Sequence, residues 1–565
     1  MRFIRLPYLL TLLAFVTLLL NGCGGKAWRY DPGIPGKVTN LRAESGNQLV
    51  TLSWTGDTTA TRYRVYYVSA LSSEELTRTN SVVVTCKQKS VVIGQLQNGV
   101  AYRFMVTALN KDGESEDSDR VACTPAAPVS TDLEGIWYFH TLVTGPDARW
   151  ERGTLTVQAD GSAAISDFED SSGNTNSPTP VVLSVDAAGG VTQSGAGAWA
   201  DFHGNLGSRK NLIVATWSAG LQSRALTIFQ KRKDDAAPAY SIQDISGTGS
   251  GQNPYNPYIQ GNGPTRFAYH QLYSGSKTQW EYANAKVGQH GNIWIDDYKD
   301  IIYWDFSTPI SKTVNYDYLW KCTSVGVDAD GRVTEYWNFP DVASAQIPSF
   351  NTLVPKQPHD VVFTGRMTGD KTVVIGVGTT TDYDGGNPRY FMRIVQLCFI
   401  PTDQALPTPG LDDLAGDYTF HRIASGAPGE APAPSWAHGN MTVAQSGGTS
   451  FTSYLDSTGA TAGGAFMLAY YPDPNPDLKL YTDFANFTTA PQDGGSHYYD
   501  VDGNPLATYY DFASFGSYVG IPSTWRTEDV SGRYYNEHAS LSYNRDLLVM
   551  TGTDASGFGM LVGLK

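Results

Sequence analysis

Three histidines recur at one position of an internal repeat, and they come closest in this chain to a metal-binding pattern. His140, His270 and His421 each directly follow an aromatic residue. Imidazole is a common metal ligand, so three copies that met at a symmetry axis could share an ion. A histidine that repeats with its aromatic neighbour can instead be a packed, hydrogen-bonded part of the fold, and we expect this second role. The sequence therefore assigns no metal ligand.

Acidic turns are the second candidate for an ion site. A calcium loop alternates oxygen ligands before a glycine and closes with a bidentate acid downstream. Three segments carry two acids but no clear closing glutamate: Asp328-Ala329-Asp330-Gly331, Asp382-Tyr383-Asp384-Gly385 and Asp500-Val501-Asp502-Gly503. We expect hairpin turns there, with calcium as the alternative, and we expect no other cofactor apart from covalent lipid.

No catalytic residue is assigned from sequence. The glycine-rich run Gly247–Gly251 has the wrong spacing for a nucleophile elbow or a phosphate loop. Paired acids such as Asp296 and Asp297 keep a glycosidase open as an alternative, because distances between carboxylates cannot be read from a sequence.

Tyrosines in polar or Pro/Gly-rich stretches could stack on sugar rings, since a flat aromatic face beside hydrogen-bonding groups suits carbohydrate. They are Tyr255, Tyr258, Tyr470, Tyr471, Tyr498, Tyr499, Tyr509 and Tyr510. Tyrosine pairs are also ordinary in strands, where one ring faces the core and the other faces water. Both interpretations stay open.

The chain begins with the pattern of an export signal. Arg2 and Arg5 precede an apolar run from about Leu6 to Leu20, and no acid lies among these residues. The run is too short for a comfortable membrane span. An export signal predicts that the mature chain lies outside the cytoplasm.

The signal ends in Leu20-Asn21-Gly22-Cys23, which resembles the bacterial lipobox. The resemblance implies a signal peptide over residues 1–22, lipid on Cys23, and a lipidated linker over residues 23–33. Several acyl chains anchor a protein stably where one does not. Gly24-Gly25 after the cysteine favours the outer membrane, by resemblance to the sorting rule of enteric bacteria.

Four cysteines remain besides Cys23, an even number that suits an oxidising compartment. We expect the pairs Cys86–Cys123 and Cys322–Cys398, because each pair falls within one predicted domain; free thiols are the alternative. No Cys-x-x-Cys spacing suggests zinc or haem.

The net charge disfavours nucleic acid as a partner. Removing residues 1–22 takes away two arginines and no acid, so the formal charge moves from −15 to −17. An acidic surface repels polyanions. The expected partners are the membrane, through the lipid, and an unidentified protein or polysaccharide.

Composition predicts an all-β protein, with 58 Gly, 33 Tyr and only 17% charged residues. Residues 34–126 alternate apolar and polar over three short runs, at Val50–Trp54, Tyr63–Val68 and Tyr102–Ala108. Together with Leu96–Tyr102, which looks like a tyrosine corner, they resemble a fibronectin type III domain. The resemblance implies a seven-stranded sandwich that acts as a spacer or a protein-binding module, and we expect a spacer.

The remaining sequence repeats three times. Leu133–His140 recurs as Leu414–His421 with a divergent copy at Phe267–His270, and tryptophan follows the histidine after 10, 10 and 15 residues. His203 and His538 share a later position, where the middle copy has threonine. The predicted units are 131–232, 241–400 and 411–565, and the repeats resemble those of uncharacterised bacterial lipoproteins. We expect small closed barrels or sandwiches, with paired blades of one β-propeller as the alternative.

The function favoured by these features is a non-enzymatic binding or scaffold protein of the cell envelope, tethered by lipid and spaced from the membrane by the fibronectin-like domain. The alternative is a carbohydrate-binding or carbohydrate-active exported protein. A groove lined by aromatic residues with two acids about 5–10 Å apart would favour the alternative.

Overall fold

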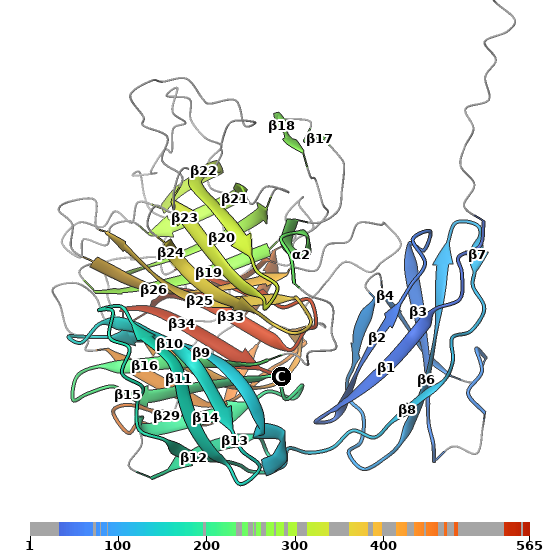
Figure 1. Ribbon diagram of the computed structural model, residues 1–565, viewed down its shortest axis with the longest axis horizontal. Coiled ribbons are helices and arrows are strands. Elements are labelled where there is room, and N and C mark those ends of the chain that lie inside the picture. The colour runs from blue at the N-terminus through green and yellow to red at the C-terminus, as the bar shows by residue number, and fades with distance from the viewer. Residues whose placement is uncertain are drawn as a thin grey trace, which may run out of the picture. The chain divides into compact units, whose positions relative to one another are not determined.

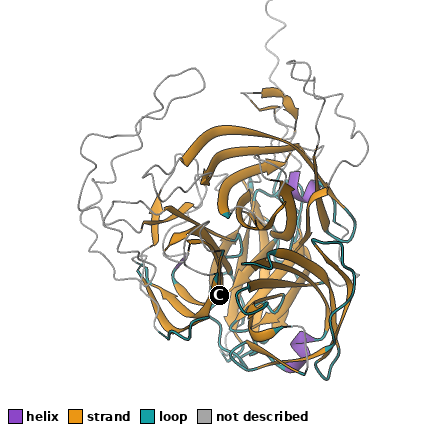
Figure 2. Cartoon of the chain, turned by 90° about the vertical axis from the view of Figure 1, so that its left-hand side faces the viewer, coloured by secondary structure: helices purple, strands orange, loops and turns teal. Residues whose placement is uncertain are grey.

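The computed structural model describes most of the chain from residue 33 onward (Figure 1). The described residues are 33–71, 75–79, 81–86, 89–195, 199–232, 240–246, 252–253, 256–260, 267–275, 278–287, 292–301, 313–337, 361–381, 388–397, 414–425, 434–445, 448–461, 468–471, 479–483, 536–554 and 557–565. They form two compact units, one before residue 126 and one after it apart from residues 46–49. Strands dominate both units (Figure 2), which confirms the all-β fold class. Within the described residues, no helix combines the length and apolarity that crossing a bilayer requires.

The first unit is an antiparallel sandwich. One sheet contains β1 (Thr39–Gly46), β2 (Leu49–Thr55) and β5 (Ser90–Ile93), and the other contains β3 (Arg62–Ser69), β4 (Val82–Cys86), β6 (Tyr102–Asn110), β7 (Gly113–Glu114) and β8 (Val121–Cys123). Alternation buries Leu52 and Trp54 of one sheet against Val65 and Phe104 of the other. The tyrosine corner forms as expected, because the Tyr102 hydroxyl accepts a hydrogen bond from the Gln97 N–H at 3.1 Å.

The second unit contains three eight-stranded repeats, of which the first is a closed barrel. A 3-10 turn, Ser130–Leu133, leads into it. Its strands are β9 (Gly135–Thr144), β10 (Arg149–Val157), β11 (Ser162–Asp170), β12 (Val181–Val185), β13 (Gly190–Ser194), β14 (Ala200–Leu206), β15 (Leu212–Ser218) and β16 (Arg224–Lys231), and β16 pairs with β9 to close the ring. The turn at Gly161 needs glycine, since its φ is +84° and a Cβ would lie 2.3 Å from the Leu183 carbonyl oxygen.

The second repeat also closes as a barrel. Its strands are β19 (Phe267–Gly275), β20 (Gln279–Val287), β21 (Asn292–Ile301), β22 (Thr313–Val327), β23 (Arg332–Trp337), β24 (Val361–Met367), β25 (Val373–Thr381) and β26 (Pro388–Leu397). The short helix α2 (Gln243–Ser246) and a small hairpin of β17 (Gln252–Asn253) and β18 (Asn256–Gln260) precede it.

The third repeat is one curled sheet whose order matches the barrels. Its strands are β27 (Gly416–Ala424), β28 (Ser435–Val443), β29 (Thr449–Asp456), β30 (Leu468–Tyr471), β31 (Lys479–Asp483), β32 (Asn536–Leu541), β33 (Leu547–Asp554) and β34 (Gly557–Leu564), with β29 and β30 at the two ends of the sheet. Two repeats therefore close as barrels and the third is a curled sheet with the same strand order, so the propeller alternative is wrong.

A single apolar core joins the three repeats. On each first strand one set of alternate residues faces the interior of its own barrel, as Phe139 does, and the other set faces outward. The outward residues Leu142, Leu272 and Ile423 belong to one cluster that draws on all three repeats. Burying one such aliphatic side chain contributes about 1.5–3 kcal/mol, so this shared core is the main attraction between the repeats.

The pairing registers show that the repeats are equivalent residue by residue. Trp150 pairs with Leu142, Trp280 with Leu272, and Trp436 with Ile423. All three tryptophans are buried in or beside the shared interface. The longer gap from His421 to Trp436 is therefore an insertion in the turn between β27 and β28, and it leaves the pairing unchanged.

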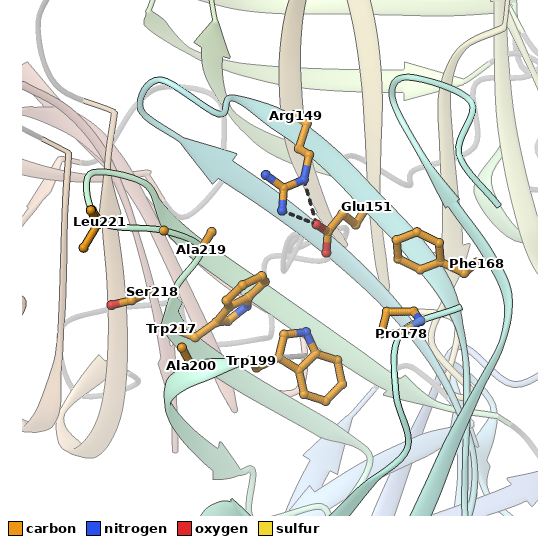
Figure 3. A pocket seen from close by; sticks show the side chains of 11 residues that line it. Arg149, Glu151, Phe168, Pro178, Trp199, Ala200, Trp217, Ser218, Ala219 and Leu221 are labelled. Carbon is orange, nitrogen blue, oxygen red and sulfur yellow. Dashed lines mark hydrogen bonds and ion pairs between the residues drawn. The ribbon is translucent and has the colours of Figure 1, made fainter. Parts of the chain in front are cut away.

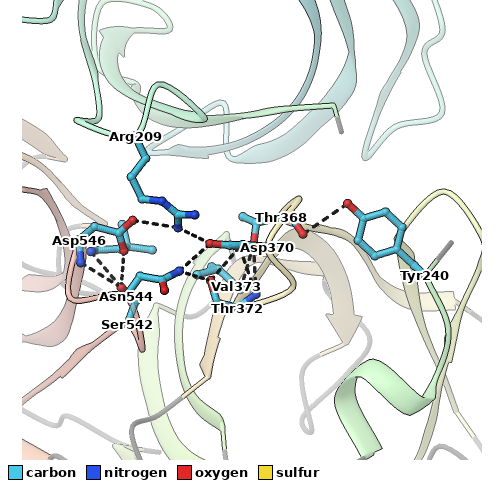
Figure 4. A network of polar contacts seen from close by, with 10 residues as sticks. Arg209, Tyr240, Thr368, Asp370, Thr372, Val373, Ser542, Asn544 and Asp546 are labelled. Atoms are coloured by element: carbon cyan, nitrogen blue, oxygen red, sulfur yellow. Dashed lines mark hydrogen bonds and ion pairs between the residues drawn. The ribbon is translucent and has the colours of Figure 1, made fainter. Parts of the chain in front are cut away.

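Three equivalent loops meet where the repeats converge. Arg209, Asp370 and Asn544 each precede a residue with a positive φ of 59–63°. The Arg209 guanidinium forms ion pairs with Asp370 and Asp546, and the Asn544 amide donates to Asp370 Oδ2 at 2.6 Å (Figure 4). Burial by itself would raise the pKa of Asp370, but the Arg209 charge and hydrogen bonds from threonine hydroxyls lower it to about 2. One cation thus links all three repeats.

Candidate functional site

A pocket opens at one end of the first barrel, with a volume of about 600 Å³ (Figure 3). Its lining comes from the beginning of β10, from β11 and the loop after it, from the start of β14, and from the end of β15 with the turn that follows. Ligand sites in barrels commonly lie at such a mouth and combine an apolar lining with a few polar groups. This pocket is therefore a candidate site for ligand binding.

The floor of the pocket is aromatic. Trp199 and Trp217 are 2% and 3% exposed, and Phe168 is 7% exposed, so each contributes an edge of a packed ring. The Trp217 indole N–H donates to Thr227 Oγ1 at 2.8 Å, and the Trp199 ring meets Phe229 edge to face at 5.6 Å. These contacts fix the rings before any ligand arrives, and a preorganised surface loses little entropy on binding.

One ion pair provides the polar wall. Arg149 Nε and Nη2 lie 2.8 and 2.6 Å from Glu151 Oε1. Burial raises the pKa of Glu151, and the Arg149 charge offsets part of that rise. The pair therefore presents donors and acceptors side by side with almost no net charge.

The rim of the pocket is an ordered turn. Arg224 Nη1 donates to the carbonyl oxygens of Gly220 and Leu221, and Ser223 Oγ donates to Asp147. The Leu221 side chain is nevertheless 98% exposed. The turn thus holds the exposed Leu221 side chain beside the aromatic floor of the pocket.

The site is better suited to binding than to glycoside hydrolysis. Hydrolysis of that kind uses two carboxylates flanking one bond. Of the described residues that line the pocket, Glu151 is the one carboxylate. Asp170 pairs with Glu151 in the sheet, but its Oδ1 accepts from the backbone and hydroxyl of Ser172 and from the Asn174 N–H. Asp170 is therefore committed to its own turn.

The repeated histidines lie at three different contacts between repeats. His270 hydrogen bonds to Thr551 Oγ1 at 2.9 Å and Ser540 Oγ at 2.8 Å of the third repeat. His421 hydrogen bonds to Thr216 Oγ1 at 3.2 Å and Asn205 Oδ1 at 2.9 Å of the first. Burial lowers the pKa of both imidazoles. They act as hydrogen-bonded contacts between repeats.

His140 lacks the Nδ1 partner that His270 and His421 have. This nitrogen is buried and has no hydrogen bond to any described residue. The register explains this, because Thr216 and Thr551 correspond to Val377 on β25. Burial first, and then nearby arginines that include Arg366, lower the pKa of His140 to about 3.

Substituting Val377→Thr is expected to raise the free energy of unfolding by about 1 kcal/mol, because the hydroxyl would supply the missing partner of His140 Nδ1. Urea denaturation measures the change. A buried hydroxyl that finds no partner is destabilising. A fall in the free energy of unfolding would therefore contradict the equivalence of position 377 with Thr216 and Thr551. Val377→Ala is the control, since it removes bulk without adding a donor.

Some of the remaining sequence predictions concern described residues, and others concern residues outside them. Asp328 Oδ1 accepts from the N–H groups of Asp330 and Arg332, as in a hairpin turn. The other two acidic turns, the side chains of the eight tyrosines considered for sugar binding, and Cys23 lie outside the described residues. Arg149 and Glu151 were not predicted as site residues. Their signal in the sequence is that they flank Trp150, so that in a strand both point to the face opposite that tryptophan.

The register opposes one predicted disulfide. Cys86 pairs with Tyr63, whereas Cys123 pairs with Tyr102, which itself pairs with Ser69. Six residues of strand separate the two positions along β3, or roughly 20 Å, and a disulfide needs its Cα atoms within about 7 Å. The Cys123 thiol is free and half-buried. The Cys86–Cys123 pairing is therefore incompatible with this sandwich, while Cys322–Cys398 stays a prediction because Cys398 lies outside the described residues.

Comparisons with known proteins identify the first unit. Residues 36–124 match the model of the fibronectin type III domain, which confirms that prediction. A Kelch domain-containing protein of Saccharolobus solfataricus is 31% identical over 114 residues, which is 20% of this chain and 15% of that protein.

Solved structures resemble the chain at low identity. A protein of unknown function from the DUF3598 family of Nostoc punctiforme is 8% identical and covers 47% of this chain and 96% of its own, with a TM-score of 0.18. A transferrin binding protein B mutant from Haemophilus parasuis is 8% identical and covers 89% and 94%, with a TM-score of 0.17.

Proposed function

We propose that this chain is a lipid-anchored binding protein of the bacterial cell envelope, and that it holds its ligand at the open end of the first barrel. The observation that carries the proposal is the pocket itself, in which preorganised aromatic edges lie beside the Arg149–Glu151 pair. An apolar floor with one hydrogen-bonding wall matches a ring that has one apolar face and several hydroxyls. The ligand class that we propose is therefore carbohydrate.

The proposal is tested by screening the full chain, purified in mild detergent, against polysaccharides of bacterial envelopes by affinity electrophoresis. We expect retarded migration with at least one neutral or weakly charged glycan. Unchanged migration with the whole panel, together with no cleavage, would contradict the carbohydrate assignment.

A protein partner is the second candidate, and the exposed Leu221 favours it. Isolated exposed leucines are common on protein surfaces, but this one borders a pocket. Leu221→Ser should weaken a protein complex at least tenfold and leave the unfolding temperature unchanged. Leu71→Ser is the matched control, because Leu71 is 80% exposed on the fibronectin domain.

Lipid attachment is tested separately. Cys23→Ser should abolish labelling by a fatty-acid probe in growing cells and release the chain from the membrane fraction, since the thiol is the acceptor atom of the proposed anchor. Labelling that persists in the variant would refute the anchor while leaving the pocket proposal intact.

A further inference from the structure

The interior of the second barrel holds several buried charged and polar side chains at one end. Residues 269, 271 and 273 of β19 face inward, as do Glu281 of β20 and Arg393 of β26. Glu281 occupies the same register position as Glu151 of the first barrel, because their cross-strand neighbours Gln271 and Thr141 are equivalent. The polar end of the second barrel therefore corresponds to the pocket end of the first.

Most charged groups of this interior have partners. Glu281 accepts hydrogen bonds from the Tyr273 and Tyr269 hydroxyls and from the Gln271 amide. Arg393 forms an ion pair with Glu335 and also donates to Gln271. These contacts are what buried charges require.

Arg389 is the exception among them. It is 4% exposed, and its Cζ lies 4.1 Å from the centre of the Tyr273 ring. Its Nε and Nη2 are buried and have no hydrogen-bond partner among the described residues. Nε–H and Nη2–H lie on one edge of the guanidinium and point the same way, and this edge is a fork that fits two oxygens of a carboxylate or phosphate.

The side chains around Arg389 differ from those at the equivalent end of the first barrel. Gly378 on β25 stands where the first barrel has Trp217, since both residues pair with equivalent positions of the following strand. At the same level, the buried Phe391 of β26 stands where the first barrel has Ala225, so the large ring here comes from β26 instead of β25.

We propose that Arg389 binds an oxyanion group of a ligand, a carboxylate or a phosphate, at the polar end of the second barrel. The two unpartnered N–H groups supply both hydrogen bonds, and the Tyr273 ring holds the guanidinium plane in place. This site is separate from the pocket of the first barrel, so either can fail without the other.

The test compares sodium phosphate and sodium acetate with sodium chloride of equal ionic strength, using the unfolding temperature of the full chain in mild detergent. We expect at least one oxyanion to raise this temperature by about 3 °C or more over chloride, because a ligand of the folded state stabilises it. Acetate alone, phosphate alone, or both would support a carboxylate site, a phosphate site or a general oxyanion site. Equal unfolding temperatures in all three salts would overturn the proposal.

Variants of Arg389 test whether the rise in unfolding temperature comes from its Nε–H and Nη2–H groups. Arg389→Gln should remove the response, and Arg389→Lys, which keeps the charge without the fork, should weaken the apparent affinity at least fivefold. Arg332→Gln is the control, because Arg332 is exposed at the β22–β23 turn of the same barrel. If Arg389→Gln does not fold, Arg389→Lys decides; an unchanged affinity in either folded variant would overturn the proposal.

Discussion

Replacing Arg209 with alanine is expected to lower the free energy of unfolding of the three-repeat unit by about 3–5 kcal/mol. Arg209 is 8% exposed, and it lies between Asp370 and Asp546, whose side chains are 11% and 15% exposed. Removing the guanidinium leaves two carboxylates close together in a site from which water is largely excluded. Each repeat contributes one of the three side chains, so the loss falls on the contacts that hold the repeats together.

Urea denaturation of Arg209→Ala measures this loss. Arg152→Ala is the matched control, because Arg152 pairs with Glu169 on a more open surface, with 21% and 42% of the side chains exposed. Such a pair contributes up to about 1 kcal/mol. Adding Asp370→Asn to Arg209→Ala should restore part of the stability by removing one unpaired charge. Equal losses for Arg209→Ala and Arg152→Ala would contradict the role given to the central cation.

Acid is expected to destabilise the three-repeat unit already between pH 6.5 and 4.5. Burial lowers the pKa of His140 and of His270 to about 3, from an ordinary value of 6.5. The unfolded chain therefore binds protons that the folded chain refuses, and stability that is complete above pH 6.5 is lost as the pH falls toward 3. At pH 4.5 the loss is about 2–3 kcal/mol for each of these two histidines.

Denaturation curves at pH 8, 6, 5 and 4.5 test this dependence. The double variant His140→Gln with His270→Gln should lose stability at pH 8, because imidazole contacts are gone, but its stability should change less between pH 8 and 4.5. Most carboxylates titrate below this window, so they contribute little to the difference. A wild-type stability that stays level down to pH 4.5 would show that the imidazoles are not buried in neutral form.

The sequence was most informative where the signal was local. Alternation and the Trp54, Leu96 and Tyr102 motifs predicted the fibronectin sandwich, and the aromatic-histidine repeat predicted three related β units. The repeat could not reveal why the histidine recurs, because the partners of His270 lie in the next repeat, at Ser540 and Thr551. The repeated residues are visible in the sequence, but which of them meet across two repeats is not.

The pocket was not predicted, and the predicted Cys86–Cys123 disulfide was wrong, for the same reason. Arg149 and Trp217 lie far apart in the sequence and meet only because the barrel closes, so no short motif connects them. Cys86 and Cys123 share a domain, but strand register places them at opposite ends of β3. Two cysteines of one domain need not have their Cα atoms within the roughly 7 Å that a disulfide requires.

The most direct test of the proposed function is the affinity of the full chain for envelope polysaccharide, measured by titration calorimetry for the wild type and for Glu151→Gln. The substitution keeps the size of the side chain but removes its charge and alters its hydrogen bonding with Arg149. We predict measurable binding by the wild type and at least a tenfold weaker affinity in the variant, with the far-ultraviolet spectrum unchanged. Equal affinities, or no binding by the wild type, would contradict a carbohydrate site at the end of the first barrel.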